Sequence, residues 1–190
     1  MLNKKLAVFF IISFIAISFT SFSQSTNKPT YVIVHGAWGG GWAFKKVDSL
    51  LTAAGNKVYR PTLTGQGERV HLATPEIGLS THIQDVVNTI LFEDLHNVIL
   101  IGHSYGGMVV TGVADSLPER ISKLIYLDAF VPEDGESVFA QGRTPEGMKP
   151  LMENGFLIPR WVRANQAAPK DVPHSVKTFT DKISLKNPKD

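Results

Sequence analysis

A serine between two glycines, where two apolar runs meet, is the residue of this sequence best suited to chemistry. The residues Gly102-His103-Ser104-Tyr105-Gly106 fit the pattern G-x-S-x-G. Between a strand and a helix, this pattern forms a sharp turn that lifts a nucleophilic serine above the edge of a sheet. Side chains in place of the glycines would collide with neighbouring backbone. Ser104 is therefore predicted to be a nucleophile at a helix N-terminus, where free N–H groups favour a developing anion. The alternative is an ordinary strand–turn–helix junction.

A second loop offers groups that would stabilise such an anion. His35-Gly36 follows an apolar run. In folds built on the serine turn, one backbone N–H of this loop and one of the residue after the nucleophile form the oxyanion hole. Ala37 and Tyr105 would supply them. Gly36 and Trp38 are predicted to contact substrate, with core or lid packing as the alternative for Trp38. The loop "HGAWGGGWAF" fits neither the dinucleotide pattern nor the P-loop pattern, so no nucleotide site is predicted.

A serine hydroxyl needs an adjacent base to become a good nucleophile. His103 is expected to point away from the serine turn, and His35 to order its own loop. His174 is the only histidine after Ser104, and nothing in the sequence places it within hydrogen-bond reach of that serine. Three further histidines are expected on the surface: His71, His82 and His96.

Composition excludes several kinds of protein. The 190 residues suit one domain, and the net charge of +2 comes without the basic stripe of a nucleic-acid-binding protein. There is no cysteine, so the fold must rely on an apolar core, and thiolate metal sites are excluded. No two histidines have the spacing of metal ligands, and neither a metal nor another cofactor is predicted. The sequence does not indicate an oligomeric state.

The N-terminus resembles a secretory signal. Lys4 and Lys5 precede an apolar run over 6–19, and cleavage is expected near Ser23-Gln24. The run is shorter than the ~20 residues of a membrane-spanning helix, which is the alternative. We therefore expect a signal peptide over 1–23 and an exported domain over 24–190, periplasmic or secreted, with no membrane contact after cleavage.

The elements that position the serine alternate between strand and helix. Apolar runs predict strands over 31–34, 57–60, 97–101 and 123–127, and helices are predicted over about 42–54, after Ser80, and over 108–117. The helix over 42–54 has an apolar face that includes Val47 and Leu50. This alternation implies a doubly wound, mainly parallel α/β sheet. Six prolines between 132 and 173 indicate an insertion or lid over about 131–180.

Several stretches together resemble the α/β-hydrolase superfamily: "YVIVHGAWGGGW", "YRPTLTGQGERVHL", "STHIQDVVNTI", "VILIGHSYGGMVVTGVAD" and "LIYLDAFVPEDGES". Within it, the chain is similar over about 30–185 to small bacterial carboxylesterases related to plant methylesterases and hydroxynitrile lyases. The resemblance implies the strand order 57–60, 31–34, 97–101, 123–127, with a lid after the last strand. It also implies hydrolysis of small carboxylic esters through an acyl-enzyme on Ser104, without a cofactor. Hydroxynitrile lyases carry Thr where this chain has Gly36, which favours an esterase.

The same resemblance leaves the catalytic triad incomplete. It places an acid and then a histidine in two further strand–helix units, whereas this sequence stops at Asp190. We therefore expect a C-terminally truncated chain whose base histidine is not present, with 123–127 as an exposed apolar edge. Such a form should be poorly stable and nearly inactive. Asp128, at the end of that strand, is a candidate acid; the alternative is a polar strand-end residue.

The sequence thus predicts an exported serine hydrolase acting on a small-molecule ester. Two alternatives remain open. One is a hydroxynitrile lyase, and the other is a non-catalytic α/β-hydrolase-like protein that binds a small ligand.

Overall fold

A four-stranded parallel sheet forms the centre of the molecule. The structure is a computed structural model that describes residues 28–140 and 151–186. The strands are β1 (Thr30–Val34), β2 (Lys57–Tyr59), β3 (Val98–His103) and β4 (Ile121–Leu127), and they lie in the order β2-β1-β3-β4. This is the predicted order. The predicted signal peptide lies outside the described residues.

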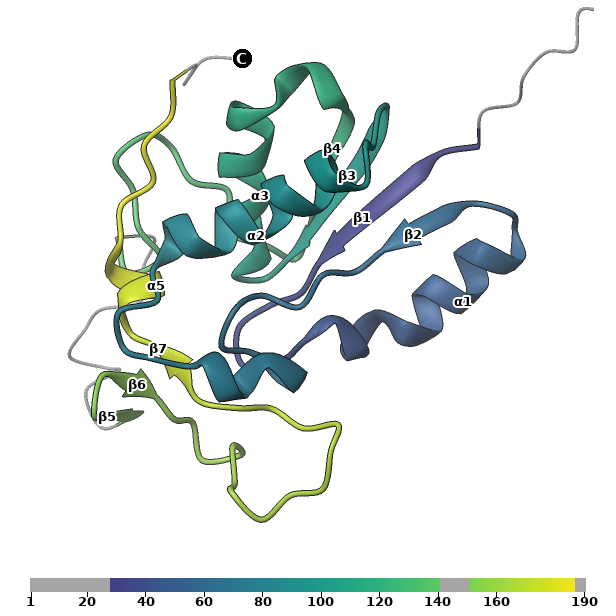
Figure 1. The fold of residues 1–190 in the computed structure, drawn as a ribbon. Helices are drawn as coiled ribbons and strands as arrows, with labels where there is room; N and C mark the ends of the chain where they lie inside the picture. Colours follow the sequence, from purple (N-terminus) through teal and green to yellow (C-terminus); the bar gives the residue numbers. More distant parts are fainter. Residues whose placement is uncertain (1–27, 141–150, 187–190) are drawn as a thin grey trace, which may run out of the picture.

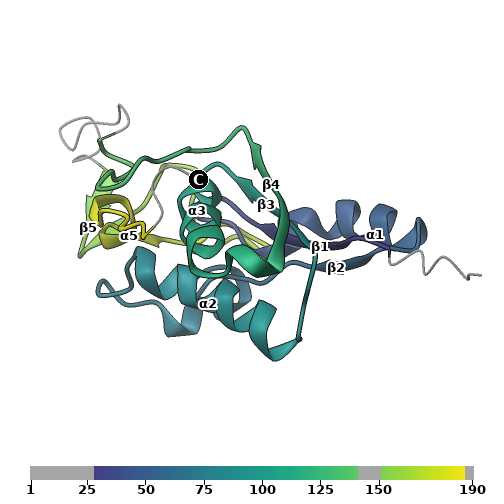
Figure 2. The same ribbon diagram turned by 90° about the horizontal axis from the view of Figure 1, so that it is seen from above.

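Helices cover the two faces of the sheet unequally. Helices α2 (Leu79–Phe92) and α3 (Gly106–Ser116) lie on one face, and α1 (Lys45–Ala53) lies on the other, beside β2 (Figures 1 and 2). Short 3-10 helices span Gly41–Phe44, Gly67–Leu72 and Pro118–Arg120. None of the helices in the described part of the chain is long and apolar enough to cross a membrane.

The core lies between the central strands and the pair α2 and α3. Val32, Leu100 and Met108 are fully buried there. The two helices approach closely because Gly112 of α3 faces Ile83 of α2, and a Cβ at Gly112 would overlap the isoleucine side chain. Small and apolar residues along α3 therefore form a largely buried helix, close to the range 108–117 that the sequence predicts.

Helix α1 forms where predicted, but its apolar face is not buried. The side chains of Val47 and Leu50 are 41% and 64% exposed, and none of the residues of α1 is buried. The amphipathic pattern predicted the helix correctly, and the structure shows that its apolar face is left largely exposed. Periodicity reports which side chains share a face, whereas burial depends on what the described chain places against that face.

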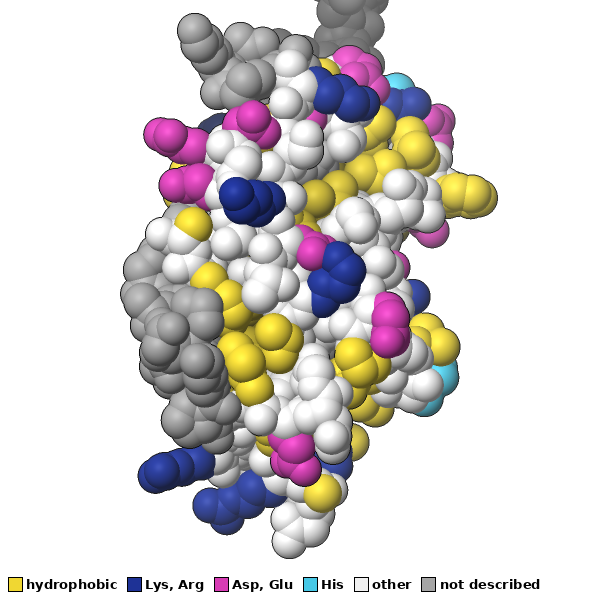
Figure 3. Space-filling model, turned by 90° about the vertical axis from the view of Figure 1, so that its left-hand side faces the viewer, with side chains coloured by type: hydrophobic (Ala, Val, Ile, Leu, Met, Phe, Trp, Pro, Cys, Tyr) yellow, Lys and Arg dark blue, Asp and Glu magenta, His cyan; other side chains and the backbone are white. Residues whose placement is uncertain are grey.

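The described residues after β4 add no further strand to the parallel sheet. Residues 151–186 form a small antiparallel sheet of β5 (Met152–Glu153), β6 (Phe156–Leu157) and β7 (His174–Ser175), followed by α5 (Lys177–Thr180). We call them the 151–186 segment. Its Leu157 and Phe179 are buried in the main core. On the side of the molecule that carries α5 and β7, charged side chains of both signs are scattered among hydrophobic patches (Figure 3).

Candidate active site

Ser104 lies on a sharp turn between β3 and α3. Its φ is +52°, a backbone conformation that L-residues rarely adopt and that costs about 1–3 kcal/mol. The flanking glycines make the turn sterically feasible. A Cβ at Gly102 would lie 2.7 Å from the Gly106 carbonyl oxygen, and one at Gly106 would lie 2.7 Å from the Val34 carbonyl oxygen. A Cβ at Gly107 would overlap the Phe130 carbonyl oxygen. These are the collisions that the sequence predicts.

The end of β4 fixes the backbone of this turn. The Ser104 N–H donates to the Leu127 carbonyl oxygen at 3.4 Å, and the Phe130 N–H donates to the Ser104 carbonyl oxygen at 3.1 Å. Within the described residues, Ser104 Oγ has no hydrogen-bond partner. Hydrogen bonds thus fix the main chain of Ser104, whereas its hydroxyl is available to bind another group.

The Gly36–Ala37 peptide lies beside the serine turn. A Cβ at Gly36 would lie 3.0 Å from both Ser104 Cβ and His103 Nδ1, so only glycine fits without displacing a neighbour. The carbonyl oxygen of this peptide accepts a hydrogen bond from His35 Nδ1 at 2.7 Å. Because the N–H of a trans peptide points opposite to its carbonyl, His35 sets the direction of the Ala37 N–H.

His35 is buried and neutral. Its Nε2 accepts a hydrogen bond from the Leu63 N–H at 3.0 Å, which leaves the proton on Nδ1 for the Gly36 carbonyl. Burial lowers the pKa of His35 from 6.5 to about 4. The ring is therefore a fixed donor and acceptor rather than a proton-transfer group near neutral pH.

The two predicted anion-stabilising amides have no acceptor of their own. Among the described residues, neither the Ala37 N–H nor the Tyr105 N–H donates a hydrogen bond. Tyr105 precedes the first residue of α3, so its amide also lies at the positive end of that helix dipole. Backbone amides without an acceptor are the kind of donor that stabilises a developing negative charge.

Trp38 is bound to the 151–186 segment. Its Nε1 donates to the Leu157 carbonyl oxygen at 3.1 Å, and its ring lies edge-on to Trp161 with centroids 5.5 Å apart. It also packs against the ring of Phe179. These contacts support the packing alternative for Trp38; its predicted contact with substrate stays a prediction.

His82 is the histidine that the sequence misplaces. The prediction of a surface residue is wrong, because the side chain is fully buried on α2. Its Nδ1 lies 3.0 Å from the Tyr105 hydroxyl, and its Nε2 lies 2.9 Å from the Thr64 carbonyl oxygen. A signal was available, since His82 recurs at four-residue spacing with the buried Val86 and Ile90.

The remaining histidines do not serve Ser104 in this structure. His71 and His96 are exposed, as predicted. His103 packs edge-on against Phe44, with centroids 5.9 Å apart. His174 is fully buried, and its Nδ1 accepts a hydrogen bond from the Trp38 N–H. None of the six histidines, all of which the structure describes, forms a hydrogen bond with Ser104 Oγ.

Asp128 follows the last residue of β4. It is exposed and has a φ of +45°. Strand register pairs Leu127 with His103, so Asp128 begins beside the serine turn. In the described part of the chain, its carboxylate has no hydrogen-bond or ion-pair partner.

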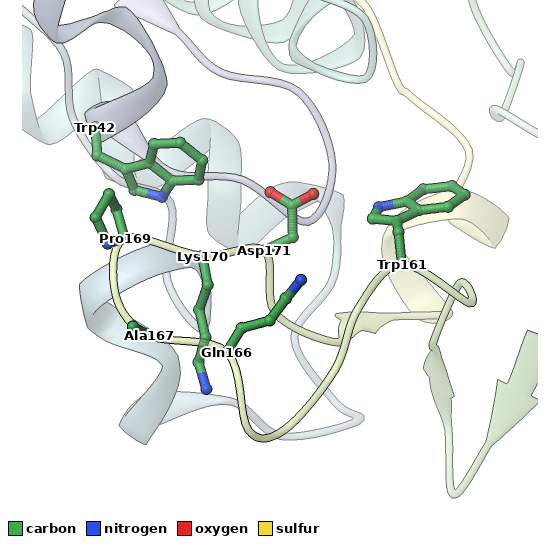
Figure 4. Close-up of a pocket in the computed structure, with 7 residues that line it drawn as sticks. All are labelled: Trp42, Trp161, Gln166, Ala167, Pro169, Lys170 and Asp171. Atoms are coloured by element: carbon green, nitrogen blue, oxygen red, sulfur yellow. The ribbon is translucent and has the colours of Figure 1, made fainter.

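One hollow on the surface of the structure lies away from the serine. A cavity of about 390 Å³ has Trp42 and Trp161 on opposite sides, with Asp171 between them (Figure 4). The rest of its lining comes from Gln166, Ala167, Pro169 and Lys170. Neither Ser104, Ala37 nor Tyr105 lines it. Two of the three tryptophans thus line this hollow, while Trp38 packs beside it.

Residues 31–185 match the sequence model of the alpha/beta hydrolase family, which includes the serine turn and the loop after β1. The chain belongs to this family. Among curated relatives, it is 49% identical over 127 residues to the carbendazim hydrolyzing esterase of Nocardioides sp. (strain SG-4G), covering 67% of this chain and 52% of that protein. It is 30% identical over 133 residues to methylesterase 2 of Arabidopsis thaliana, covering 66% and 51%.

Solved members of the family share the fold. An extracellular alpha/beta-hydrolase from a Paenibacillus species superposes with a TM-score of 0.73 at 27% identity, covering 83% of this chain and 72% of that one. Methylesterase MES16 from Arabidopsis gives a TM-score of 0.61 at 26% identity, covering 81% and 70%. The chain spans about half the length of the curated relatives that it matches.

Proposed function

We propose that this chain carries the acyl-transfer centre of a carboxylic ester hydrolase, with Ser104 as the nucleophile. The observation that carries the proposal is the strained backbone of Ser104, at φ +52°, together with two nearby amides that have no acceptor among the described residues. Strain of this kind persists where the surrounding structure enforces it, and it clusters at functional sites. Ala37 and Tyr105 provide the two amides.

The chemistry follows the geometry. Ser104 Oγ attacks the carbonyl carbon of the ester, and the electrons of the carbonyl π bond move to its oxygen. The Ala37 and Tyr105 N–H groups stabilise this oxyanion. A base takes the Ser104 hydroxyl proton during the attack; when the carbonyl re-forms, the bond to the alcohol oxygen breaks and the alcohol leaves with that proton. Water then attacks the acyl-serine in the same way and releases the carboxylic acid.

Proton transfer requires a base, and the proposal assigns none of the six histidines to that role. Two of them are exposed, three are buried with hydrogen bonds to other residues, and His103 packs against the ring of Phe44. Asp128 is the candidate acid that would orient an imidazole, since it lies at the strand end next to the serine turn and its carboxylate has no partner among residues 28–140 and 151–186. Since no group in the described part of the chain forms a hydrogen bond with Ser104 Oγ, an added base is a useful experimental variable.

Small esters are the proposed substrates. The relatives named as esterases support this class. The position of Gly36 supports ester hydrolysis over cyanohydrin cleavage. Hydroxynitrile lyases carry a threonine at this position, and in this structure the Cβ of a threonine would press on Ser104 and His103. Residues 1–23 are proposed as a signal for export, in line with an extracellular neighbour of the same fold.

Covalent labelling of Ser104 tests the proposal. The chain would be incubated with a fluorophosphonate or with p-nitrophenyl acetate, each with and without imidazole as an added base. Mass spectrometry of the peptide that contains Ser104 would locate the adduct, and Ser104→Ala would correct for reactions elsewhere. We expect modification of Ser104, faster with imidazole. A folded chain that stays unmodified under both conditions would favour a non-catalytic ligand-binding protein.

A further inference from the structure

His174 is a buried histidine whose presence the serine chemistry does not explain. It lies on β7, fully buried, with its ring centroid 5.0 Å from that of Tyr105 and 5.3 Å from that of Phe179. Its Nε2 has no hydrogen-bond partner among the described residues. Burial lowers the pKa of His174, so the ring is neutral. A buried polar atom without a partner lowers stability, so an apolar residue would suit this position better unless the other nitrogen has a task.

The other nitrogen holds the backbone of Trp38. His174 Nδ1 accepts a hydrogen bond from the Trp38 N–H at 3.1 Å, and the Val172 N–H donates to the Trp38 carbonyl oxygen at 2.8 Å. Both backbone polar groups of Trp38 are therefore bound to one stretch of the 151–186 segment. The φ of Trp38 is +64°, in the left-handed region that a tryptophan rarely adopts.

This contact adjoins the proposed oxyanion donor. Ala37 is flanked by two peptide units, and an imidazole holds each of them. His35 fixes the Gly36–Ala37 unit through its carbonyl oxygen, and His174 fixes the Ala37–Trp38 unit through its N–H. Without the second contact, Trp38 could relax to negative φ, which would turn the peptide that follows Ala37 and shift the Ala37 N–H.

We infer that His174 is a positioning residue for the oxyanion hole. It holds Trp38 in its strained conformation and so keeps the Ala37 N–H directed at the oxygen of the reacting carbonyl. The 151–186 segment would then contribute to the acylation site through the hydrogen bond between His174 and the Trp38 N–H. This inference rests on the proposed function of Ser104.

Three variants separate positioning from general stability. His174→Leu removes the acceptor and keeps an apolar volume. His174→Asn keeps an acceptor oxygen at the position of Nδ1. Val172→Ala shortens a buried side chain two residues away and leaves both backbone bonds of Trp38 in place. The rate of Ser104 acetylation by p-nitrophenyl acetate would be measured with saturating imidazole, below the unfolding transition of each variant.

We expect His174→Leu to slow acylation about 100-fold, as misplacement of a catalytic group by about 1 Å does. His174→Asn and Val172→Ala should stay close to the parent rate even where they unfold at a lower temperature. A folded His174→Leu protein that reacts at the parent rate would overturn the inference. So would a rate that falls equally in Val172→Ala, because stability would then be the cause.

Hydrogen exchange at the Trp38 amide provides a readout that needs no activity. The amide should be protected in the parent and in His174→Asn, and should exchange rapidly in His174→Leu. If the parent chain is never acylated, the proposed function fails, and exchange alone decides whether His174 holds Trp38. Equal exchange in the parent and His174→Leu would overturn the inference whatever the activity.

Discussion

The Trp38 N–H and His174 Nδ1 lie 3.1 Å apart, although 136 positions separate the two residues in the sequence. The contact joins the loop after β1 to the 151–186 segment. The same segment accepts the Trp38 indole N–H on the Leu157 carbonyl oxygen. Residues remote from the serine motif therefore determine the backbone next to the proposed oxyanion hole.

The positive φ of Ser104 should be measurable as strain. In the left-handed region an L-residue costs about 1–2 kcal/mol, and glycine does not, although glycine loses more entropy on folding. We expect Ser104→Gly to have a free energy of unfolding about 0.5–1 kcal/mol above that of Ser104→Ala. Urea denaturation would compare the two, and neither should be acylated. Equal stabilities would mean that the turn is not strained.

Crowding at Gly36 should make this position intolerant of side chains. Gly36→Thr places a Cβ 3.0 Å from Ser104 Cβ, so we expect acylation to fall about 100-fold and stability to fall by about 1–3 kcal/mol. Gly39→Ala in the same loop is the matched control, since its Cβ would meet only Asp171 Oδ1, at 4.0 Å. Similar losses in both variants would show a general sensitivity of the loop instead.

Mild acid should destabilise the fold through its buried histidines. Burial lowers the pKa of His35 to about 4 and also lowers the pKa values of His82 and His174. Below pH 6.5 the unfolded rings bind protons that the folded rings do not, so the free energy of unfolding falls as the pH is lowered. His35 alone should contribute a loss of about 3 kcal/mol between pH 6.5 and pH 4.

Urea titrations at several pH values would measure this dependence. His82→Asn should make the loss smaller, because one of the three buried rings is removed. His71→Gln, which changes an exposed side chain, should leave the loss unchanged. A stability that stays constant from pH 7 to pH 5 would contradict the assignment of neutral buried rings.

The outer edge of β4 should promote self-association. In the described residues no strand pairs with that edge, and Leu127 is 48% exposed there. We expect Leu127→Lys to reduce concentration-dependent association, because charged side chains protect sheet edges. The reverse change, Lys123→Leu on the same face of the strand, should increase it. Light scattering over a range of concentrations would record both, and a lack of response to either change would exclude this edge.

Local patterns predicted the frame of the site. The alternation of apolar runs and helical periods predicted the four strands, and the resemblance to α/β-hydrolases predicted their order, which the structure confirms. The pattern around Ser104 predicted a sharp turn. These features were accessible because neighbours in sequence determine backbone conformation: glycines permit the turn, and apolar runs require burial on both faces.

Burial and partnership were less accessible. The prediction that His82 lies on the surface was wrong, and the exposure of the apolar face of α1 was not apparent from its sequence. Each depended on which distant segment packs against the residue. The same is true of Asp128. The sequence shows an acidic residue at the end of a strand, but not that its carboxylate has no partner among the described residues.

The sequence by itself determined that a serine stands between a strand and a helix with a glycine loop beside it, because short-range sterics fix such a turn. The sequence also indicated that His35 orders this loop, and only the tertiary structure decided that a second imidazole, that of His174, holds it as well. His35 reaches it from the adjacent position and His174 from the far end of the chain, and a hydrogen bond depends on distance in space, which packing alone sets.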